Sequence, residues 1–240
     1  MKIRTLILGS VGLAALLLVS SAPAANMVVT RIGGYYWSNG GELNVSTPDG
    51  SLNGVIAGYD SKATAVSPIT QLRGLETFCL EHDERVQMNT SVNYGISSRA
   101  ISGGSGGPSP DPISLGTAWL YSQFAQGTLA GYDWDPLATR STSAGLLQKT
   151  FWWLEDEAGY AYDAANPFML AAVNEFGATV KDDAGANNFG TWVINAGPAR
   201  LYPYQDMLIW KKPGVPDGGI TVILLGLGLS ALGLIRRKVA

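Results

Sequence analysis

Two side chains that can act as a nucleophile or as an acid–base group lie three residues apart in the stretch TFCLEHD, residues 77–83. Cys79 is the only cysteine and His82 the only histidine in the 240 residues. Exported domains usually use cysteines in pairs, as disulfides. A single cysteine outside the cell is therefore a link to another molecule, a reactive thiol, or a small buried hydrophobe.

The proximity of Cys79 and His82 does not by itself predict a hydrolytic pair. Such pairs normally come from distant segments of a chain, and a strand over residues 75–81 would turn the two side chains to opposite faces. One histidine and one cysteine among carboxylates also lack a metal-ligand spacing, so no metal or cofactor is predicted. A solvated turn is expected at His82, Asp83 and Glu84, and the polar end of a helix at Glu155, Asp156 and Glu157.

The elements that must position Cys79 are predicted from hydrophobic patterns and from turn residues. Strands are expected at residues 27–31, 41–46, 75–81, 86–96, 190–195 and 204–211. Helices are expected at about residues 114–126 and 143–157, and from the Asn166-Pro167 start to Gly177. A Gly-Ser-Pro loop at residues 102–110 separates the first strands from the helices. The pattern predicts an α+β class: a β-rich, sandwich- or barrel-like domain with an insertion of about three helices.

The N-terminal segment, residues 1–25, has the layout of a signal peptide. Lys2 and Arg4 precede an apolar core, and small residues end at Ala25, where a signal peptidase would cut. The domain between the targeting segments is expected at residues 26–212. The chain has a formal net charge of −3 and no basic patch, which argues against nucleic acid as a partner.

The C-terminal segment, residues 213–240, has a three-part layout. The residues Val215, Pro216, Asp217, Gly218 and Gly219 precede an apolar run at 220–235, and the basic residues Arg236, Arg237 and Lys238 follow it. This layout resembles the sorting signals that exosortases process in Gram-negative bacteria, in the variant that begins Val-Pro-Asp-Ser-Gly. The resemblance implies export, a transient membrane helix, cleavage by an exosortase, and transfer to the cell surface or extracellular matrix. The alternative is a tail anchor that is never cut. The apolar run at 220–235 is slightly short for it, because a comfortable bilayer span needs about 20 residues.

Three segments between the targeting signals resemble bacterial thioester domains, in the order that those domains use. Phe78-Cys79-Leu80-Glu81 fits their aromatic-Cys-apolar-acidic pattern. The helical block LQKTFW, residues 147–152, matches their Thr-Gln-any-Ala-apolar-Trp block at Gln148, Phe151 and Trp152. Gln205 lies where the family places its acyl-donor glutamine, although Asp206 replaces the apolar residue usual after it.

The resemblance implies an internal thioester between Cys79 and Gln205, with capture of an amine or a hydroxyl on a target as a single event rather than enzymatic turnover. It implies a supporting position for Gln148, which is also the rival acyl donor. Aromatic side chains are expected to keep water from the bond: Phe78, Trp152 and Tyr204. The implied partner is an unidentified surface protein or polysaccharide, and the implied role is adhesion.

Two other functions fit the same sequence. The aromatic stretches Tyr35-Tyr36-Trp37 and Asp133-Trp134-Asp135 could contact a target without a covalent bond. The sorting tail alone fits a structural component of an extracellular matrix. In both cases Cys79 would be buried and inert.

Overall fold

The structure is a computed structural model that describes residues 25–38, 40–101, 110–197 and 204–213. Most of the predicted signal peptide and the predicted apolar segment at 220–235 lie outside these residues. Within them, no helix is long and apolar enough to span a membrane.

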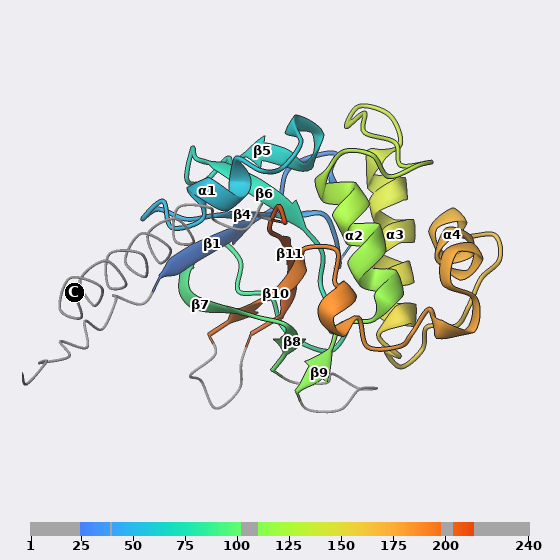
Figure 1. The fold of residues 1–240 in the computed structure, drawn as a ribbon. Coiled ribbons are helices and arrows are strands. Elements are labelled where there is room, and N and C mark those ends of the chain that lie inside the picture. The colour runs from blue at the N-terminus through green and yellow to red at the C-terminus, as the bar shows by residue number, and fades with distance from the viewer. Residues whose placement is uncertain (1–24, 39, 102–109, 198–203, 214–240) are drawn as a thin grey trace, which may run out of the picture.

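A seven-stranded antiparallel sheet forms the body of the domain, in the order β11-β10-β7-β1-β4-β6-β5 (Figure 1). Its strands are β1 (Asn26–Thr30), β4 (Leu43–Ser46), β5 (Thr64–Val66), β6 (Arg73–Thr77), β7 (Ser91–Ser97), β10 (Thr191–Ala196) and β11 (Met207–Trp210). Two small hairpins accompany it, one of β2 (Tyr36–Trp37) and β3 (Gly40–Gly41), the other of β8 (Arg99–Ala100) and β9 (Asp111–Pro112).

The sheet is closed by the segment that follows β6. Cys79 forms an isolated antiparallel bridge with Met207. On either side of it, the backbone N–H of Leu80 donates to the carbonyl of Asp206 at 2.9 Å, and that of Leu208 donates to the carbonyl of Phe78 at 3.2 Å. The chain from β6 therefore reaches β11 at the other end of the sheet, so the architecture is barrel-like, and β5 pairs with the first part of β6 outside the closure.

The helices lie together at one end of the sheet, beside the closure (Figure 1). They are α2 (Leu115–Ala125), α3 (Arg140–Leu154) and α4 (Pro167–Phe176), with one short helix, α1 (Asn53–Ile56), over the sheet. Single 3-10 turns occur at Ser61–Ala63, Gly177–Thr179 and Gly185–Asn187. The hydroxyl of Ser114 caps α2 by accepting the N–H of Thr117, and the amide of Asn166 caps α4 by accepting that of Phe168.

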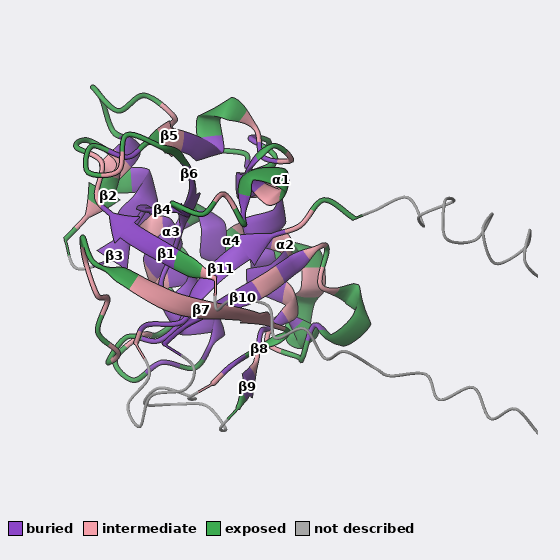
Figure 2. Cartoon of the chain, turned by 90° about the vertical axis from the view of Figure 1, so that its left-hand side faces the viewer, coloured by how far each residue is buried: buried purple, intermediate pink, exposed green. Residues whose placement is uncertain are grey.

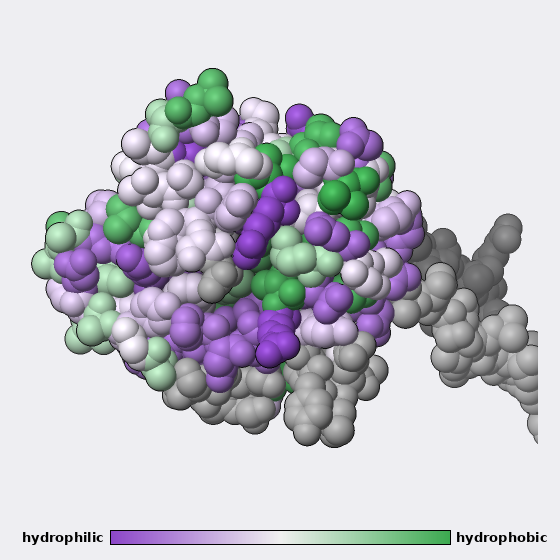
Figure 3. All heavy atoms as spheres, turned by 180° about the vertical axis from the view of Figure 1, so that it is seen from behind, coloured by the Kyte–Doolittle hydropathy of each residue, from purple (hydrophilic) through white to green (hydrophobic). Residues whose placement is uncertain are grey.

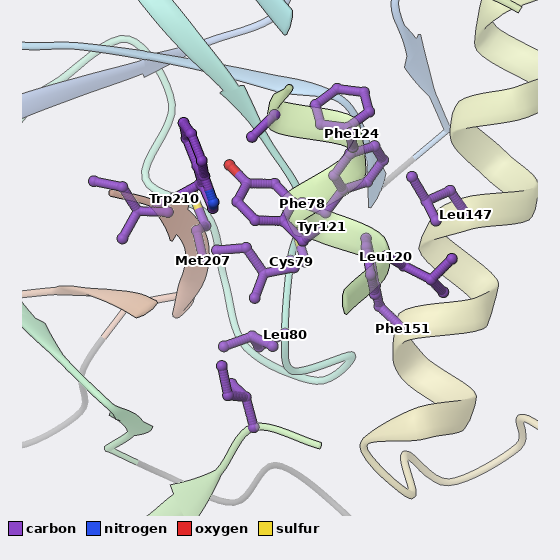
Figure 4. Close-up of a cluster of buried hydrophobic side chains, with 14 of the residues drawn as sticks. Phe78, Cys79, Leu80, Leu120, Tyr121, Phe124, Leu147, Phe151, Met207 and Trp210 are labelled. Carbon is purple, nitrogen blue, oxygen red and sulfur yellow. The ribbon is translucent and has the colours of Figure 1, made fainter. Parts of the chain in front are cut away.

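The core lies between the inner face of the sheet and the helices. Strands β1, β4, β10 and β11 are buried along almost their whole length, while β7 is half-buried (Figure 2). Four aromatic rings meet where the closing segment faces the helices. Phe78 lies edge-on to the rings of Tyr121, Phe124 and Phe151 at 6.5, 5.0 and 5.3 Å (Figure 4). Burial of these large side chains fixes the closing segment against α2 and α3.

The predicted α+β class is confirmed: the structure has a large antiparallel sheet and about four helices. The boundaries differ where a local pattern was misleading. The predicted strand 75–81 ends at Thr77 because the chain bends after Cys79, and the predicted strand 86–96 begins only at Ser91. Helix α3 begins at Arg140 and ends at Leu154, where Asp156 takes a positive φ of 60°. The sequence analysis did not predict α1 or the short strands β2, β3, β5, β8 and β9.

Candidate functional site

Cys79 lies at the closure of the barrel and is a free, buried thiol with 2% of its surface exposed. Phe78 and Cys79 both belong to the buried core, but only Cys79 also lines a cavity. The predicted role of Phe78 as a shield over the bond is therefore indirect: its ring packs in the core behind the strand and does not line the cavity beside Cys79.

Gln148 fixes the backbone of Cys79 from α3. Its Oε1 accepts the N–H of Cys79 at 3.0 Å and the N–H of Gly41 at 3.2 Å, and its Nε2 donates to the carbonyl of Cys79 at 2.8 Å. The side chain is fully buried. The amide is engaged at both ends by backbone, which favours the supporting position over that of rival acyl donor.

Gln205 lies beside Cys79 across the bridge. Because Met207 pairs with Cys79, the residue two positions before it is the diagonal neighbour of Cys79 across the two strands, within reach of a long side chain. The backbone N–H of Gln205 donates to the carbonyl of Arg85 at 3.0 Å, and its Nε2 donates to the carbonyl of Asp206 at 2.9 Å. Only 2% of Gln205 is exposed.

Both residues line one cavity of about 430 Å³. The tertiary structure thus brings together the two residues that the sequence resemblance pairs. The cavity wall consists of Arg31, Cys79, His82, Glu84, Arg85, Val86, Met88, Trp152 and Gln205.

Burial raises the pKa of the Cys79 thiol to about 12. Arg31 lowers this pKa and Glu84 raises it, but both effects are smaller than the loss of hydration. Cys79 is therefore a neutral thiol at neutral pH, and any attack by its sulfur has to be coupled to transfer of the thiol proton.

Two aromatic residues of the predicted shield differ in position. Trp152 lines the cavity, is 4% exposed, and meets the rings of His82 and Tyr160, each at 4.9 Å. Tyr204 packs against the core, and its N–H donates to the carbonyl of Ala196 at 3.0 Å. It is not part of the cavity wall, so of the three predicted shielding residues only Trp152 has that position.

His82 was expected to face away from Cys79, and this expectation is wrong. Both residues line the same cavity, because regular strand geometry ends at Thr77 and the chain bends at Leu80. The backbone N–H of His82 donates to Oε2 of Glu157 at 3.0 Å, which fixes the bend against the end of α3.

The acidic residues of the predicted turn and helix end divide into two groups: Asp83 and Asp156 are exposed, as expected, whereas Glu155 and Glu157 are buried. Glu155 and Glu157 are 7% and 1% exposed, not the polar end of a helix. Glu84 lines the cavity, and its Oε2 accepts the N–H of Asp206 at 3.1 Å. Burial, together with a hydrogen bond and charge from Glu157, raises the pKa of Glu81 to about 11. Within the described ranges, no group of three or more His, Cys, Asp or Glu residues could hold a metal ion.

The sequence analysis missed Arg31, Glu84 and Arg85 as part of this site. No spacing in the sequence marks them, because they come from the end of β1 and from an irregular segment between β6 and β7. Only the closure of the sheet brings them to Cys79 and Gln205.

Comparison with protein families identifies a VPDSG-CTERM motif at residues 214–239. The chain therefore carries an exosortase-type sorting motif at its C-terminus, which indicates an exported protein that exosortase processes and that reaches the cell surface or the extracellular space. The comparison with curated proteins found no match, and neither did the comparison with solved structures.

Proposed function

We propose that this protein is a surface-sorted adhesin that forms an internal thioester between Cys79 and Gln205 and uses it to capture a target covalently. The observation that supports the proposal most is the position of the two residues: they are diagonal neighbours across the bridge that closes the barrel, and both line one cavity. They come from distant segments that the sequence alone does not pair by spacing.

The bond would form without a cofactor. The sulfur of Cys79 attacks the side-chain carbonyl carbon of Gln205, the carbon–nitrogen bond breaks, and ammonia leaves with the thiol proton. Fixed proximity makes this step effectively unimolecular, which can contribute about 7 kcal/mol or more to lowering the barrier. The low exposure of both residues limits access of water, the competitor that would hydrolyse the product.

Capture would reverse the roles of the groups. A nucleophile attacks the Gln205 carbonyl, the carbon–sulfur bond breaks, and the Cys79 thiol is restored while Gln205 becomes linked to the target. This is a single event and not turnover. The sorting motif would present the domain at the surface of a Gram-negative cell after transient anchoring through residues 220–235.

Intact mass tests this function. The Asn26–Lys212 segment is purified and weighed before and after methylamine treatment. We expect a mass lower than calculated by one ammonia, replaced by a methylamine adduct that peptide mapping places at Gln205. The variants Cys79→Ala and Gln205→Ala should show neither change. Gln126→Ala, at the exposed residue that follows α2, should behave as wild type. A calculated mass with Cys79 open to alkylation in the folded protein would overturn the proposal.

A non-covalent matrix protein is the second candidate. The burial of Cys79 and its raised pKa of about 12 favour it, because both describe an inert thiol. The face in Figure 3 mixes hydrophilic and hydrophobic residues without one extended apolar patch, which argues against a broad docking surface on that face. The predicted contact aromatics are also largely used internally: Trp134 stacks on Phe124 at 5.1 Å, and Trp37 packs against the core.

A further inference from the structure

His82 lines the cavity that holds Cys79 and Gln205, and it is also solvent-exposed, as expected for a turn. Its ring meets Trp152 at 4.9 Å and Tyr160 at 5.1 Å, both edge-on, so the imidazole is positioned by aromatic contacts. Among the described parts of the chain, no hydrogen bond engages either ring nitrogen. His82 is solvent-exposed beside the cavity.

The charges that line the cavity disfavour a cationic nucleophile. Of the residues that line the cavity, Arg31 and Arg85 carry guanidinium groups and Glu84 carries the carboxylate. That carboxylate already accepts the N–H of Asp206, whereas the buried Nε of Arg31 has no hydrogen-bond partner in the described chain. An ammonium group entering this space meets net positive charge, while a neutral hydroxyl group does not.

We propose, on the basis of the thioester proposed above, that the captured nucleophile is a hydroxyl group and that His82 is the general base that accepts its proton. The hydroxyl oxygen bonds to the carbonyl carbon of Gln205 as its proton passes to the imidazole of His82. The carbon–sulfur bond then breaks, Cys79 leaves as a thiolate, and the imidazolium returns the proton to it. The products are an ester at Gln205 and a neutral thiol, and no other reactant is needed.

The environment of the sulfur supports the last transfer. Burial holds the pKa of Cys79 near 12, so a thiolate formed there takes the proton from an imidazolium readily. A hydroxyl group needs such assistance more than an amine that is already unprotonated, because it has to lose its proton as it attacks. Positioned general bases typically contribute about 10²–10⁴-fold to a rate.

Hydroxyl capture is tested with His82→Phe, which retains an aromatic ring against Trp152 and Tyr160 but cannot accept a proton. His82→Gln is the polar counterpart, and Asp83→Asn, at the exposed neighbour, is the control. The full domain of each variant is first weighed for the loss of ammonia. Glycerol and hydrazine are then added separately, and the rates of ester and hydrazide formation at Gln205 are followed by mass.

The capture rates are referred to the fraction of each variant that shows the loss of ammonia, so that formation of the bond and capture are measured separately. Glycerol capture should fall on the order of 10²-fold in both His82 variants, while hydrazine capture should change by less than about threefold and Asp83→Asn should match wild type. A further variant, His82→Ala, leaves space for a small base, and free imidazole should restore part of its glycerol rate.

Three outcomes overturn the proposal in distinguishable ways. Equal glycerol capture by wild type and His82→Phe removes the base role and leaves the thioester intact. An equal fall with glycerol and hydrazine assigns His82 a merely structural position. The absence of the mass deficit in wild type removes the thioester itself, and the hydroxyl proposal with it.

Discussion

Gln148 binds both backbone polar groups of Cys79: its Oε1 accepts the N–H of Cys79 at 3.0 Å, and its Nε2 donates to the carbonyl of Cys79 at 2.8 Å. A helix of the insertion thus supplies the hydrogen bonds that a neighbouring strand would give in a regular sheet. The backbone N–H and carbonyl of Cys79 are thus hydrogen-bonded to α3. The neighbouring residues Phe78 and Leu80 form backbone hydrogen bonds to the β11 segment.

The first prediction concerns this support. Gln148→Leu keeps the volume but leaves the N–H and carbonyl of Cys79 and the N–H of Gly41 without partners. Each buried unsatisfied group costs about 1–3 kcal/mol, so we expect the free energy of unfolding to fall by at least about 2 kcal/mol. Urea unfolding measures it. Gln126→Leu removes an amide bonded only within its own helix turn and should stay within about 0.5 kcal/mol of wild type; a similar loss in both variants would contradict the prediction.

The second prediction contrasts a buried ion pair with a surface one. Arg140 forms two hydrogen bonds to Glu42, at 2.9 and 2.7 Å, with both side chains almost fully buried. Arg140→Met leaves an uncompensated buried carboxylate and should cost about 3–5 kcal/mol in thermal or urea unfolding. Arg99→Met breaks a pair with Asp183 at 3.5 Å whose side chains are 47% exposed, and should cost less than about 1 kcal/mol. Equal losses of unfolding free energy in the two variants would show that burial does not decide how strongly an ion pair stabilises the fold.

The third prediction is a pH dependence. Burial, with a smaller contribution from the nearby Glu42 charge, raises the pKa of Glu76 to about 8. Between the ordinary glutamate pKa of about 4.3 and about 8, the folded state binds more protons at this site than the unfolded state, so stability falls as pH rises through that window. Glu76→Gln should lose less stability than wild type from pH 5 to pH 8, by about 1 kcal/mol or more.

Urea unfolding at pH 5, 6.5 and 8 gives that difference directly. Glu175→Gln, at an exposed position on α4, is the control and should follow wild type. Parallel pH curves for Glu76→Gln and wild type would mean that Glu76 ionises in the folded protein at its ordinary pKa. The other buried carboxyl groups with raised pKa values act in the same direction in both proteins, so their effect cancels in the comparison.

The fourth prediction concerns the contact between the β2–β3 hairpin and α3. A Cβ at Gly145 would lie 2.6 Å from Cγ of Trp37, and the whole ring would have to move. Gly145→Ala should therefore destabilise the protein despite the better helix propensity of alanine, and limited proteolysis should cut the hairpin sooner. At Gly54 in α1 no atom lies within 4 Å of such a Cβ, so Gly54→Ala should be neutral or stabilising by up to about 1 kcal/mol. If neither variant is cleaved faster than wild type, the close contact between Gly145 and Trp37 is refuted.

The fifth prediction follows from the sorting motif. Removal of residues 214–240 should leave the exported domain soluble and not attached to the cell surface, because the segment that exosortase processes is gone. Asp217→Ala within the motif should leave an uncleaved precursor in the membrane fraction, while Lys212→Ala, just before the motif, should be processed normally. Fractionation with immunoblotting measures all three. Surface display of the truncated chain would contradict the assigned sorting function.

Much of the fold could be predicted because the relevant signals are local. Hydrophobic alternation located the main strands, and the caps at Ser114 and Asn166 located two helix starts. Boundaries failed where contacts distant in sequence override local preference. Strand β6 ends at Thr77, earlier than predicted, because β11 and Gln148 form the hydrogen bonds of the residues that follow it. Glu155 is buried because it accepts hydrogen bonds from Ser114 and Thr117.

The sequence by itself determined that the chain carries an exosortase-type tail, that its lone cysteine has no cysteine partner, and that a β-rich domain encloses a helical insertion. Only the tertiary structure decided which residues meet Cys79. Gln205, His82, Arg31 and Arg85 come together because the chain after β6 bends and bridges to β11, and a closure between segments so far apart leaves no periodic trace in the sequence.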